Sequence, residues 1–449
     1  MSLIFTILVF IITISIIVVF HEYGHYIAAR FCGVKVLEFS VGFGKRLFGK
    51  KFGKDKTDYK VCVLPLGGYV RMLDEREGKV KDFEKNRAFN NQNLLKRTII
   101  VFSGPLFNFI LAIFFYFLIF MGGYSGFQPS VGVLTNNSTA ENIGMMEGDI
   151  IYSVNSNKVK TWSDATLQTI KIASNKKDIH FEVLRNGEIK LLNNISYKKI
   201  NFEDNNIFET LGIYNFTSKS LKIGYVEKDS AAELFGLMVG DKILSINNTK
   251  INNWNEIVNF VKNNPKKNLK LYILRDSITK YINVVPYSIT NNGLNIGRLG
   301  IGPLIDENEI LKNKINIKHG FFESIKLSVV KTYDFTILTM NFVFKLVKGE
   351  SSAKGISGPV GIAGYAADSF SSGYTSFLGL LAMLSISIGI LNLLPIPMLD
   401  GGHLMYYLIE FIVRRPVPEK AQLIFQQVGM TFLILLSIFV LYNDLLRIM

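Results

Sequence analysis

The sequence is poor in cysteine and in histidine. It holds two cysteines among 449 residues, Cys32 and Cys62, and they form no CxxC pair. This pattern excludes a disulfide framework and a cysteine-based zinc site, so we expect two reduced thiols that bind no metal. The chain has five histidines, so a metal pattern that uses two of them at a fixed spacing rarely arises by chance.

Acidic residues are scarce relative to basic residues. There are 36 Asp and Glu against 50 Lys and Arg, which gives a net charge of +14. Such a balance is typical of chains that meet nucleic acid or anionic lipid, but no nucleic-acid-binding motif is present. Because 49% of the residues are hydrophobic, we expect a membrane protein whose partner is the lipid bilayer and not nucleic acid.

Several long stretches carry no charge. Leu3–Phe20 is an uncharged run of 18 residues, or about 27 Å of helix, which is close to the thickness of the hydrocarbon core. No basic segment precedes it and no small-residue cleavage site follows it, so we expect a spanning helix within 1–33 and not a signal peptide. Further spans are expected at 98–124, 375–403 and 425–443.

The first apolar run ends in His21-Glu22-Tyr23-Gly24-His25. Residues four apart share one face of a helix, so His21 and His25 can bind one metal ion with Glu22 beside them as a general base. Zinc is the expected metal, because imidazoles with a carboxylate suit it and leave a position open for water. The alternative is a histidine pair at the membrane interface, but ionisable groups are costly at this depth and favour a functional site.

The polar segment 34–97 follows, with 16 Lys and Arg. Under the positive-inside rule it is cytoplasmic, which places the N-terminus outside. Val34–Gly44 and Lys60–Met72 have the composition of strands. Gly42 and Gly44 lie at a strand end, where glycine either forms an ordinary turn or permits close approach by another chain.

Two of the expected spans contain residues that disturb a helix. In 98–124, Pro105 and Asn108 are either kink residues or pocket residues. Near the end of the third span, Pro395 and Pro397 each remove a backbone donor and must interrupt the helix. Interrupted helix at membrane depth is tolerated where it lines a cavity.

The region between the second and third spans contains a repeat with a period of 92 residues. The matched positions are Ala140-Glu141 with Ala232-Glu233, Gly148-Asp149 with Gly240-Asp241, Asn155 with Asn247, and Trp162 with Trp254. The pattern resembles the core of PDZ domains, and we expect two tandem PDZ-like domains at 127–220 and 221–305. A PDZ domain offers an open strand edge to an extended peptide; the alternative is a β-rich spacer that binds nothing.

The segment 319–349 is amphipathic, with apolar residues at helical spacing and lysines between them. We expect a helix that lies on the outer membrane surface, with a further span as the alternative. After it, Ser357–Ala363 is expected to be a turn-rich approach to the third span.

A catalytic zinc usually takes three protein ligands, so a third is needed. Asp400 is the expected one. The topology above delivers it to the cytoplasmic side, where His21 and His25 emerge, whereas a fully spanning amphipathic segment would place it on the opposite side. His403 is a further candidate, but three protein ligands and a water already complete a tetrahedral site.

Together these motifs resemble the site-2 protease family, most closely its regulator-of-sigma-E protease branch in Gram-negative bacteria. The resemblance covers essentially the whole chain. It implies a multi-span α-helical membrane protein with four transmembrane helices, a membrane-associated β-loop and two tandem PDZ-like α+β domains on the extracytoplasmic side. It also implies one zinc ion per chain on His21, His25 and Asp400, with Glu22 as the general base.

The resemblance further implies two sets of substrate contacts. Gly42 and Gly44 would lie in a membrane-dipping β-loop that helps to hold substrate as a strand. Asn392, Pro395 and Pro397 would contact substrate near the scissile bond.

The implied activity is hydrolysis within or near the transmembrane segment of single-span membrane proteins whose outer domain has been clipped, such as anti-sigma factors and remnant signal peptides. The implied location is the bacterial inner membrane, with the active site near the cytoplasm and the PDZ-like domains in the periplasm. Those domains would act as a size filter or bind new C-termini.

Two other classes of function compete with this interpretation. A catalytically silent PDZ membrane scaffold would have no use for an intramembrane metal site. A metal transporter would need ionisable groups along its spans, and residues 425–441 contain none.

Overall fold

The computed structural model describes residues 2–135, 137–200, 207–214, 220–291, 294–304, 311–349 and 357–448. The chain divides into two compact units. One unit combines Met1–Tyr124 with Ile317–Met449, and the other is Ser125–Asn316. In the described part of the chain, four helices are long and apolar enough to cross a membrane, and all four belong to the first unit.

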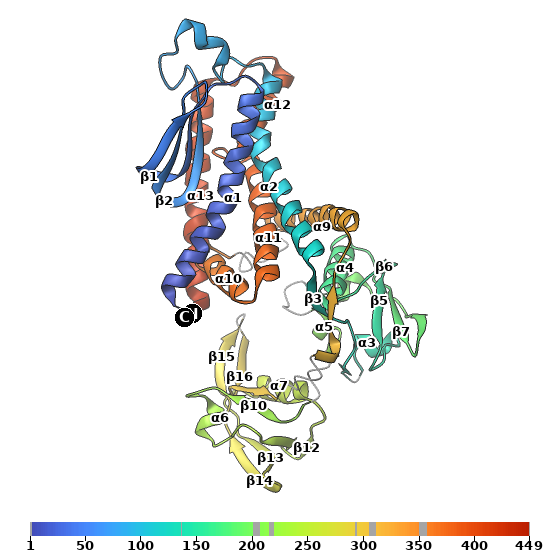
Figure 1. Ribbon diagram of the computed structural model, residues 1–449. Coiled ribbons are helices and arrows are strands. Elements are labelled where there is room, and N and C mark those ends of the chain that lie inside the picture. Colours follow the sequence, from blue (N-terminus) through green and yellow to red (C-terminus); the bar gives the residue numbers. More distant parts are fainter. Residues whose placement is uncertain are drawn as a thin grey trace. The chain divides into compact units, whose positions relative to one another are not determined.

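Three of these four helices pack on one another. α1 (Leu3–Phe31) packs on α2 (Leu94–Gly122), and α2 packs on α11 (Tyr374–Leu393). α13 (Glu419–Ile448) is the fourth. Figure 1 shows α1, α2 and α11 side by side, with a shorter helix, α10, across the end at which α1 begins; α10 also contacts α13. The expected four spans are therefore present as helices.

α10 (Pro359–Ser371) corrects the expectation of a turn-rich approach at 357–363. Proline suits the first turn of a helix, where its missing N–H needs no partner. The start of α10 is also capped by another helix, because the carboxylate of Asp444 in α13 accepts backbone N–H bonds from Gly358, Val360 and Gly361 at 2.9–3.0 Å. Sequence pattern alone does not show this contact between distant segments.

α9 (Phe321–Val347) occupies the amphipathic segment and packs against α2 and α11. It buries a small polar face that includes Ser324, Ser328 and Thr332. Its apolar stripe points away from the protein, with Phe322 82% and Val347 81% exposed. α9 is not among the four helices apolar enough to span, and an exposed apolar stripe is what a helix at a lipid surface needs.

The basic segment after α1 folds into a bent hairpin of β1 (Val36–Phe52) and β2 (Thr57–Met72). Both strands are longer than the sequence pattern indicates. Residues 38–41 of β1 pair on one side with 58–61 and on the other with 68–71 of β2. Two long strands thus make an antiparallel sheet four segments wide, which lies alongside α1 in Figure 1. The remaining elements of this unit are η1 (Asp82–Arg87), which follows the hairpin in sequence, and α12 (Asp400–Val413), which follows α11.

The second unit contains two copies of one fold. The first copy has the sheet order β6-β5-β7-β8 and the second β12-β11-β13-β14, each with one main helix, α4 or α7. The bounds are β5 Ile150–Val154, β6 Asn157–Lys158, α4 Trp162–Ser174, β7 Phe181–Arg185 and β8 Glu188–Leu191, then β11 Lys242–Ile246, β12 Thr249–Lys250, α7 Trp254–Lys262, β13 Leu269–Arg275 and β14 Ile278–Val284. Each copy has its own buried apolar core, so the 92-residue repeat is also a structural repeat.

The repeated Gly-Asp pair has a structural reason. Asp149 and Asp241 are each 1% exposed. Asp149 accepts a bond from the Arg185 guanidinium at 2.7 Å, and Asp241 accepts the equivalent bond from Arg275 at 2.6 Å. The nearby carboxylates raise the pKa of both guanidinium groups further. Each ion pair ties the start of one strand to the end of its neighbour.

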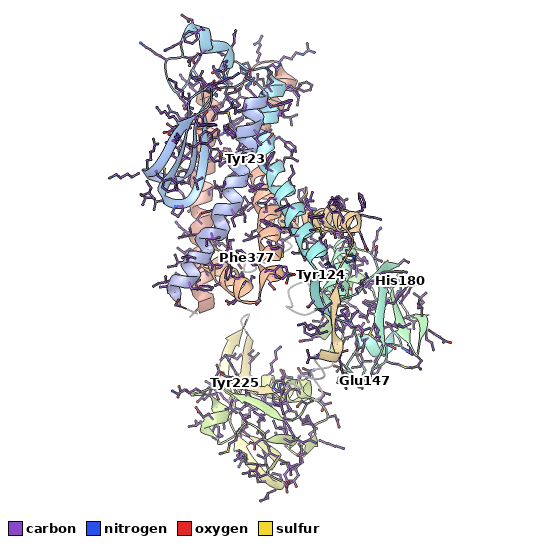
Figure 2. The ribbon with its side chains drawn as sticks, in the orientation of Figure 1. Tyr23, Tyr124, Glu147, His180, Tyr225 and Phe377 are labelled. Atoms are coloured by element: carbon purple, nitrogen blue, oxygen red, sulfur yellow. The ribbon has the colours of Figure 1, made fainter. Side chains whose placement is uncertain are left out.

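The other elements in and around the second unit are short. They are β3 Tyr124–Phe127, β4 Val133–Leu134, α3 Thr139–Asn142, η2 Tyr197–Lys199, α5 Ile207–Thr210, β9 Ile213–Tyr214, β10 Ile223–Val226, α6 Ala231–Leu234, β15 Tyr287–Asn291, β16 Leu294–Arg298, β17 Ile301–Pro303 and β18 Lys314–Ile317. Figure 2 labels Glu147 and His180 in the first copy and Tyr225 in the second.

Candidate metal centre

Three side chains from two distant segments converge inside the membrane unit. His21 and His25 lie one turn apart on α1, and Asp400 is in the first turn of α12. Asp400 Oδ2 lies 3.1 Å from His21 Nε2 and 3.4 Å from His25 Nε2, and the two Nε2 atoms are 3.3 Å apart. Both histidines are buried.

The donor atoms fit a zinc ion. Tetrahedral zinc with bonds of about 2.0–2.1 Å places its ligand atoms about 3.3–3.4 Å from one another, close to the distances seen here. Asp400 Oδ2 is buried without a hydrogen-bond partner, and a bound cation would compensate this oxygen. Among the described residues, these three side chains are the group of His, Cys, Asp or Glu that could hold a metal.

One face of α2 shapes the centre. The Ile100 carbonyl oxygen accepts a bond from His25 Nδ1 at 2.8 Å, which leaves Nε2 free to bind a metal. One turn on, a Cβ on Gly104 would lie 2.2 Å from His25 Nε2. Another turn on, the buried Asn108 amide lies 3.3 Å from His21 Nδ1. Of the two interpretations of Asn108, kink or pocket, its contact with His21 supports the pocket.

Gly24, between the two histidines, lets the helices approach closely. A Cβ there would lie 2.3 Å from the Ser103 carbonyl oxygen of α2. The sequence pattern did not identify Gly24 and Gly104 as site residues. The four-residue spacing of Ile100, Gly104 and Asn108 could have identified Gly104, because it places these three residues on one helix face.

Glu22 faces the hairpin. A Cβ on Gly68 of β2 would lie 3.2 Å from Glu22 Cγ, and a backbone hydrogen bond from Val70 reaches the Glu22 side chain. The hairpin is also attached to α1 where Ser15 Oγ donates to the Pro65 carbonyl at 3.0 Å. The outer segment of the sheet, residues 68–72, therefore lies against the proposed general base.

The helix in the 375–403 segment is interrupted, as its two prolines predict. α11 ends at Leu393, and the chain is not regularly helical until Asp400. Met398 has a φ of +88°, a strained conformation for a side-chain-bearing residue that recurs at functional sites. Asn392 is thus in the last turn of α11, and Pro395 and Pro397 are in the loop that leads to Asp400.

Three glycines make room for this loop. A Cβ on Gly401 would lie 2.1 Å from the Leu394 carbonyl oxygen, and one on Gly402 would lie 2.5 Å from that of Ile396. In α13, a Cβ on Gly429 would lie 2.5 Å from the Pro397 carbonyl oxygen. The loop is held at backbone distance on two sides, so Asp400 has little freedom to move.

The glycines of the hairpin also have a structural role. Gly42 and Gly44 both have φ of +88°, which glycine adopts without strain. A Cβ on Gly42 would lie 2.6 Å from the Leu64 carbonyl oxygen. The close approach of the Leu64 backbone thus explains the glycine at 42, and the positive φ explains the glycine at 44. Contact of either glycine with substrate is a hypothesis.

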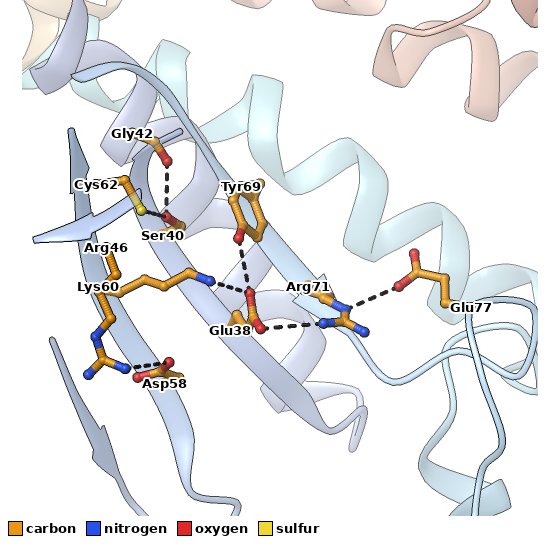
Figure 3. Close-up of polar contacts among 10 residues, drawn as sticks. All are labelled: Glu38, Ser40, Gly42, Arg46, Asp58, Lys60, Cys62, Tyr69, Arg71 and Glu77. Carbon is orange, nitrogen blue, oxygen red and sulfur yellow. Dashed lines mark hydrogen bonds and ion pairs between the residues drawn. The ribbon is translucent and has the colours of Figure 1, made fainter. Parts of the chain in front are cut away.

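Glu38 is the centre of a polar network across the sheet, shown in Figure 3. Its carboxylate accepts bonds from Lys60 Nζ at 2.6 Å, Tyr69 Oη at 3.0 Å and Arg71 Nη1 at 3.3 Å. The Lys60 bond lowers the pKa of Glu38 and raises the pKa of Lys60 to about 12. One side chain therefore ties together the three segments that carry residues 38, 60 and 69–71.

Further contacts align α1 and α12 with their neighbours. Tyr23, labelled on α1 in Figure 2, stacks on Tyr26, whose hydroxyl lies 2.5 Å from that of Tyr59 in the hairpin. On α12, the helix that begins at Asp400, Glu410 pairs with Arg97 of α2 at 2.6 Å. His403 lies outside the group of three ligands.

Comparison with known proteins identifies the family of the chain. The model of peptidase family M50 matches residues 9–436. The chain is similar to the regulator of sigma-E protease RseP of Escherichia coli, with 34% identity over 447 residues that cover 98% of both chains. It is also 34% identical to the regulator of sigma E protease of Haemophilus influenzae over 454 residues, or 100% of both.

A protein of Vibrio cholerae that carries a zinc metalloprotease name is 36% identical over 443 residues, 98% of both chains. All these matches run through the first span, the repeated modules and the segment that carries Asp400. Because they cover nearly the whole length, the chain belongs to peptidase family M50, the site-2 proteases, and it is an intramembrane zinc metalloprotease.

Proposed function

We propose that His21, His25 and Asp400 hold one zinc ion and that Glu22 is the general base for peptide hydrolysis. The single observation that carries this proposal is the convergence of three buried donor atoms within 3.4 Å of one another, next to Glu22. Zinc bound there would polarise the peptide carbonyl and lower the pKa of a bound water toward about 7.

The chain's own groups perform the proton transfers. The Glu22 carboxylate takes the proton of the attacking water and then donates it to the leaving amine nitrogen. Its position beside Gly68 and Val70 keeps it at the edge of the hairpin sheet. The Ile100 carbonyl keeps the His25 ring in the tautomer whose Nε2 points into the centre.

A transmembrane substrate must leave its helical form before cleavage, because helix hydrogen bonds hide its peptide groups. We propose that the unwound segment adds as a strand to residues 68–72, the outer segment of the sheet beside Glu22. Gly42 and Gly44 bend the sheet into this position. Asn392, Pro395 and Pro397 face the substrate from the Asp400 side in this proposal.

The substrates in this proposal are single-span membrane proteins whose outer domain is already clipped. The names of the Escherichia coli and Haemophilus influenzae relatives support a role in sigma-E regulation, with an anti-sigma factor as substrate and remnant signal peptides as a second group. The relatives are bacterial and the chain has four candidate spans, which supports the inner membrane, with the metal centre toward the cytoplasm.

The two repeated modules are PDZ-like domains on the periplasmic side in this proposal. Their role is either to exclude substrates with bulky outer domains or to bind newly formed C-termini. Removal of residues 131–286 distinguishes these roles from a passive spacer. A filter predicts that unclipped substrates become cleavable, and a peptide-binding role predicts loss of response to added C-terminal peptides.

The test of the catalytic proposal uses the purified full chain and its Glu22→Gln variant, with a clipped single-span substrate. We expect cleavage only by the unchanged chain and about one zinc per chain in both proteins. Cleavage by Glu22→Gln would refute the role of Glu22. Absence of both zinc and cleavage in the unchanged chain would leave a membrane scaffold as the better explanation.

A further inference from the structure

We propose that Asn108 is a positioning residue of the metal centre, which accepts a hydrogen bond from His21 Nδ1–H and so presents Nε2 to zinc. The inference rests on the proposed zinc site. It adds a residue from α2, a helix that contributes none of the three ligands.

The first argument is the inequality of the two histidines. His25 Nδ1 has a main-chain acceptor, the Ile100 carbonyl oxygen at 2.8 Å. The comparable neighbour of His21 Nδ1 is the Asn108 amide at 3.3 Å. Histidine ligands of zinc commonly donate their second ring N–H to a fixed acceptor, which sets both the tautomer and the ring orientation. Asn108 is the group in that place for His21.

The second argument concerns which end of the amide faces the ring. When Nε2 binds zinc, Nδ1 carries the hydrogen and can only donate, so its neighbour must be an acceptor. Asn108 Oδ1 is buried without a hydrogen-bond partner, while Nδ2 faces the ring. Rotation by 180° about the last side-chain bond exchanges these two atoms. That rotation places Oδ1 against Nδ1–H and gives the buried oxygen a partner.

The third argument is that Asn108 itself is firmly held. It is 0% exposed, and its backbone carbonyl oxygen accepts a bond from Ser385 Oγ of α11 at 2.8 Å. A Cβ on Gly389 of α11 would lie 3.3 Å from Asn108 Cβ, so the two helices are in contact here. The backbone and the Cβ of Asn108 are thus fixed against α11, so the amide extends toward the His21 ring from a defined position.

The test measures zinc affinity as well as activity. Asn108→Leu keeps the approximate volume but removes the acceptor, and Asn108→Asp keeps an oxygen that can accept. We expect Asn108→Leu to weaken zinc binding about 10- to 100-fold, the usual effect of losing such a partner. Asn108→Asp keeps the acceptor and is therefore expected to bind zinc without this loss of about 10- to 100-fold.

Zinc affinity is measured by chelator competition on the full chain in detergent, and melting of the zinc-free proteins is measured in parallel. Ser103→Ala is the matched control, because the bond that the described residues give this α2 hydroxyl is to the Ile99 carbonyl of its own helix, at 2.6 Å. It is expected to leave the affinity unchanged.

The outcomes separate the inference from the proposed function. If the unchanged chain binds no zinc, the proposed function fails. If it binds zinc and Asn108→Leu binds equally tightly, the positioning role is refuted while the zinc site stands. Equal losses of zinc affinity in Asn108→Leu and Asn108→Asp would assign Asn108 to packing and overturn the inference. A lower melting temperature of zinc-free Asn108→Leu, large enough to account for its loss of zinc affinity, would do the same.

Discussion

The metal centre and the repeated modules reach stability by different routes. The centre joins α1, α2 and α12, whose contacting residues are up to 379 positions apart in sequence, as Asp400 is from His21. Each module is built from neighbouring strands and held by an ion pair between residues 34 or 36 positions apart, Asp241–Arg275 and Asp149–Arg185. The centre therefore depends on the fit of whole helices, whereas a module depends on contacts within one short stretch.

The difference also appears in the use of glycine. At the centre, glycines permit backbone and ring contacts that a single methyl group would prevent, as at Gly24 and Gly104. In the modules, Gly144 and Gly148 have positive φ with open space around them. Substitution should therefore act by collision at Gly24 and Gly104 and by backbone strain at Gly144 and Gly148. Three experiments test this comparison.

The largest effect is expected from Gly104→Ala. Its methyl group would lie 2.2 Å from His25 Nε2, so this proposed metal ligand must move or the helices must separate. We expect zinc affinity and cleavage to fall at least about 100-fold, the upper range for disturbed metal surroundings. Bound zinc is measured after gel filtration.

Gly364→Ala is the control for this substitution. Gly364 is a helical glycine of α10 with open space where a Cβ would be. Full zinc content in Gly104→Ala would show that the helix interface at the centre adapts, and that the two regions differ less than the geometry indicates.

An intermediate effect is expected from Asp241→Asn. Breaking a buried ion pair costs about 3–5 kcal/mol of unfolding free energy, and we expect about 3 kcal/mol because 16% of the Arg275 side chain remains exposed. The second module should become sensitive to limited proteolysis while the zinc content of the chain stays unchanged. A fall in zinc content would contradict the independence of the modules from the centre.

The matched control breaks an exposed pair in the same module. Glu227 and Arg298 lie 3.0 Å apart with side chains 39% and 55% exposed. Such pairs contribute about 0–1 kcal/mol, so Glu227→Gln should leave protease resistance nearly unchanged.

The smallest effect is expected from protonation of Glu38, in the hairpin. Its pKa in the folded chain is lowered from 4.5, first by the Lys60 hydrogen bond. A carboxylate with a lowered pKa stabilises the fold at pH above its unfolded value, and this contribution is lost as pH falls through the folded value. Hairpin stability should therefore decline below about pH 4.5.

Hydrogen exchange of the amides in residues 57–61, corrected for intrinsic rates, measures this change. Glu38→Gln should show lower protection at neutral pH and a flatter dependence on pH. An identical pH profile in both proteins would mean that other carboxylates control the acid response of the sheet.

Much of the architecture follows from sequence pattern. Uncharged runs locate the four spanning helices because hydrocarbon demands apolar residues over a fixed length. The 92-residue repeat predicts two similar β-rich modules. In contrast, Ser357–Ala363 has glycine and proline typical of turns, yet Pro359 begins α10, whose start is capped by Asp444 from the last helix. That contact is tertiary, so local pattern cannot predict it.

The sequence by itself determined the placement of the groups proposed for catalysis: His21 and His25 on one helix face, Glu22 beside them, and proline-interrupted helix before Asp400. These follow from residue type and spacing, which a helix converts directly into position. The tertiary structure alone decided that α2 would line the centre with Ile100, Gly104 and Asn108. Such contacts arise only when helices pack at close distance, and the physical reason is that packing joins residues that no local period relates.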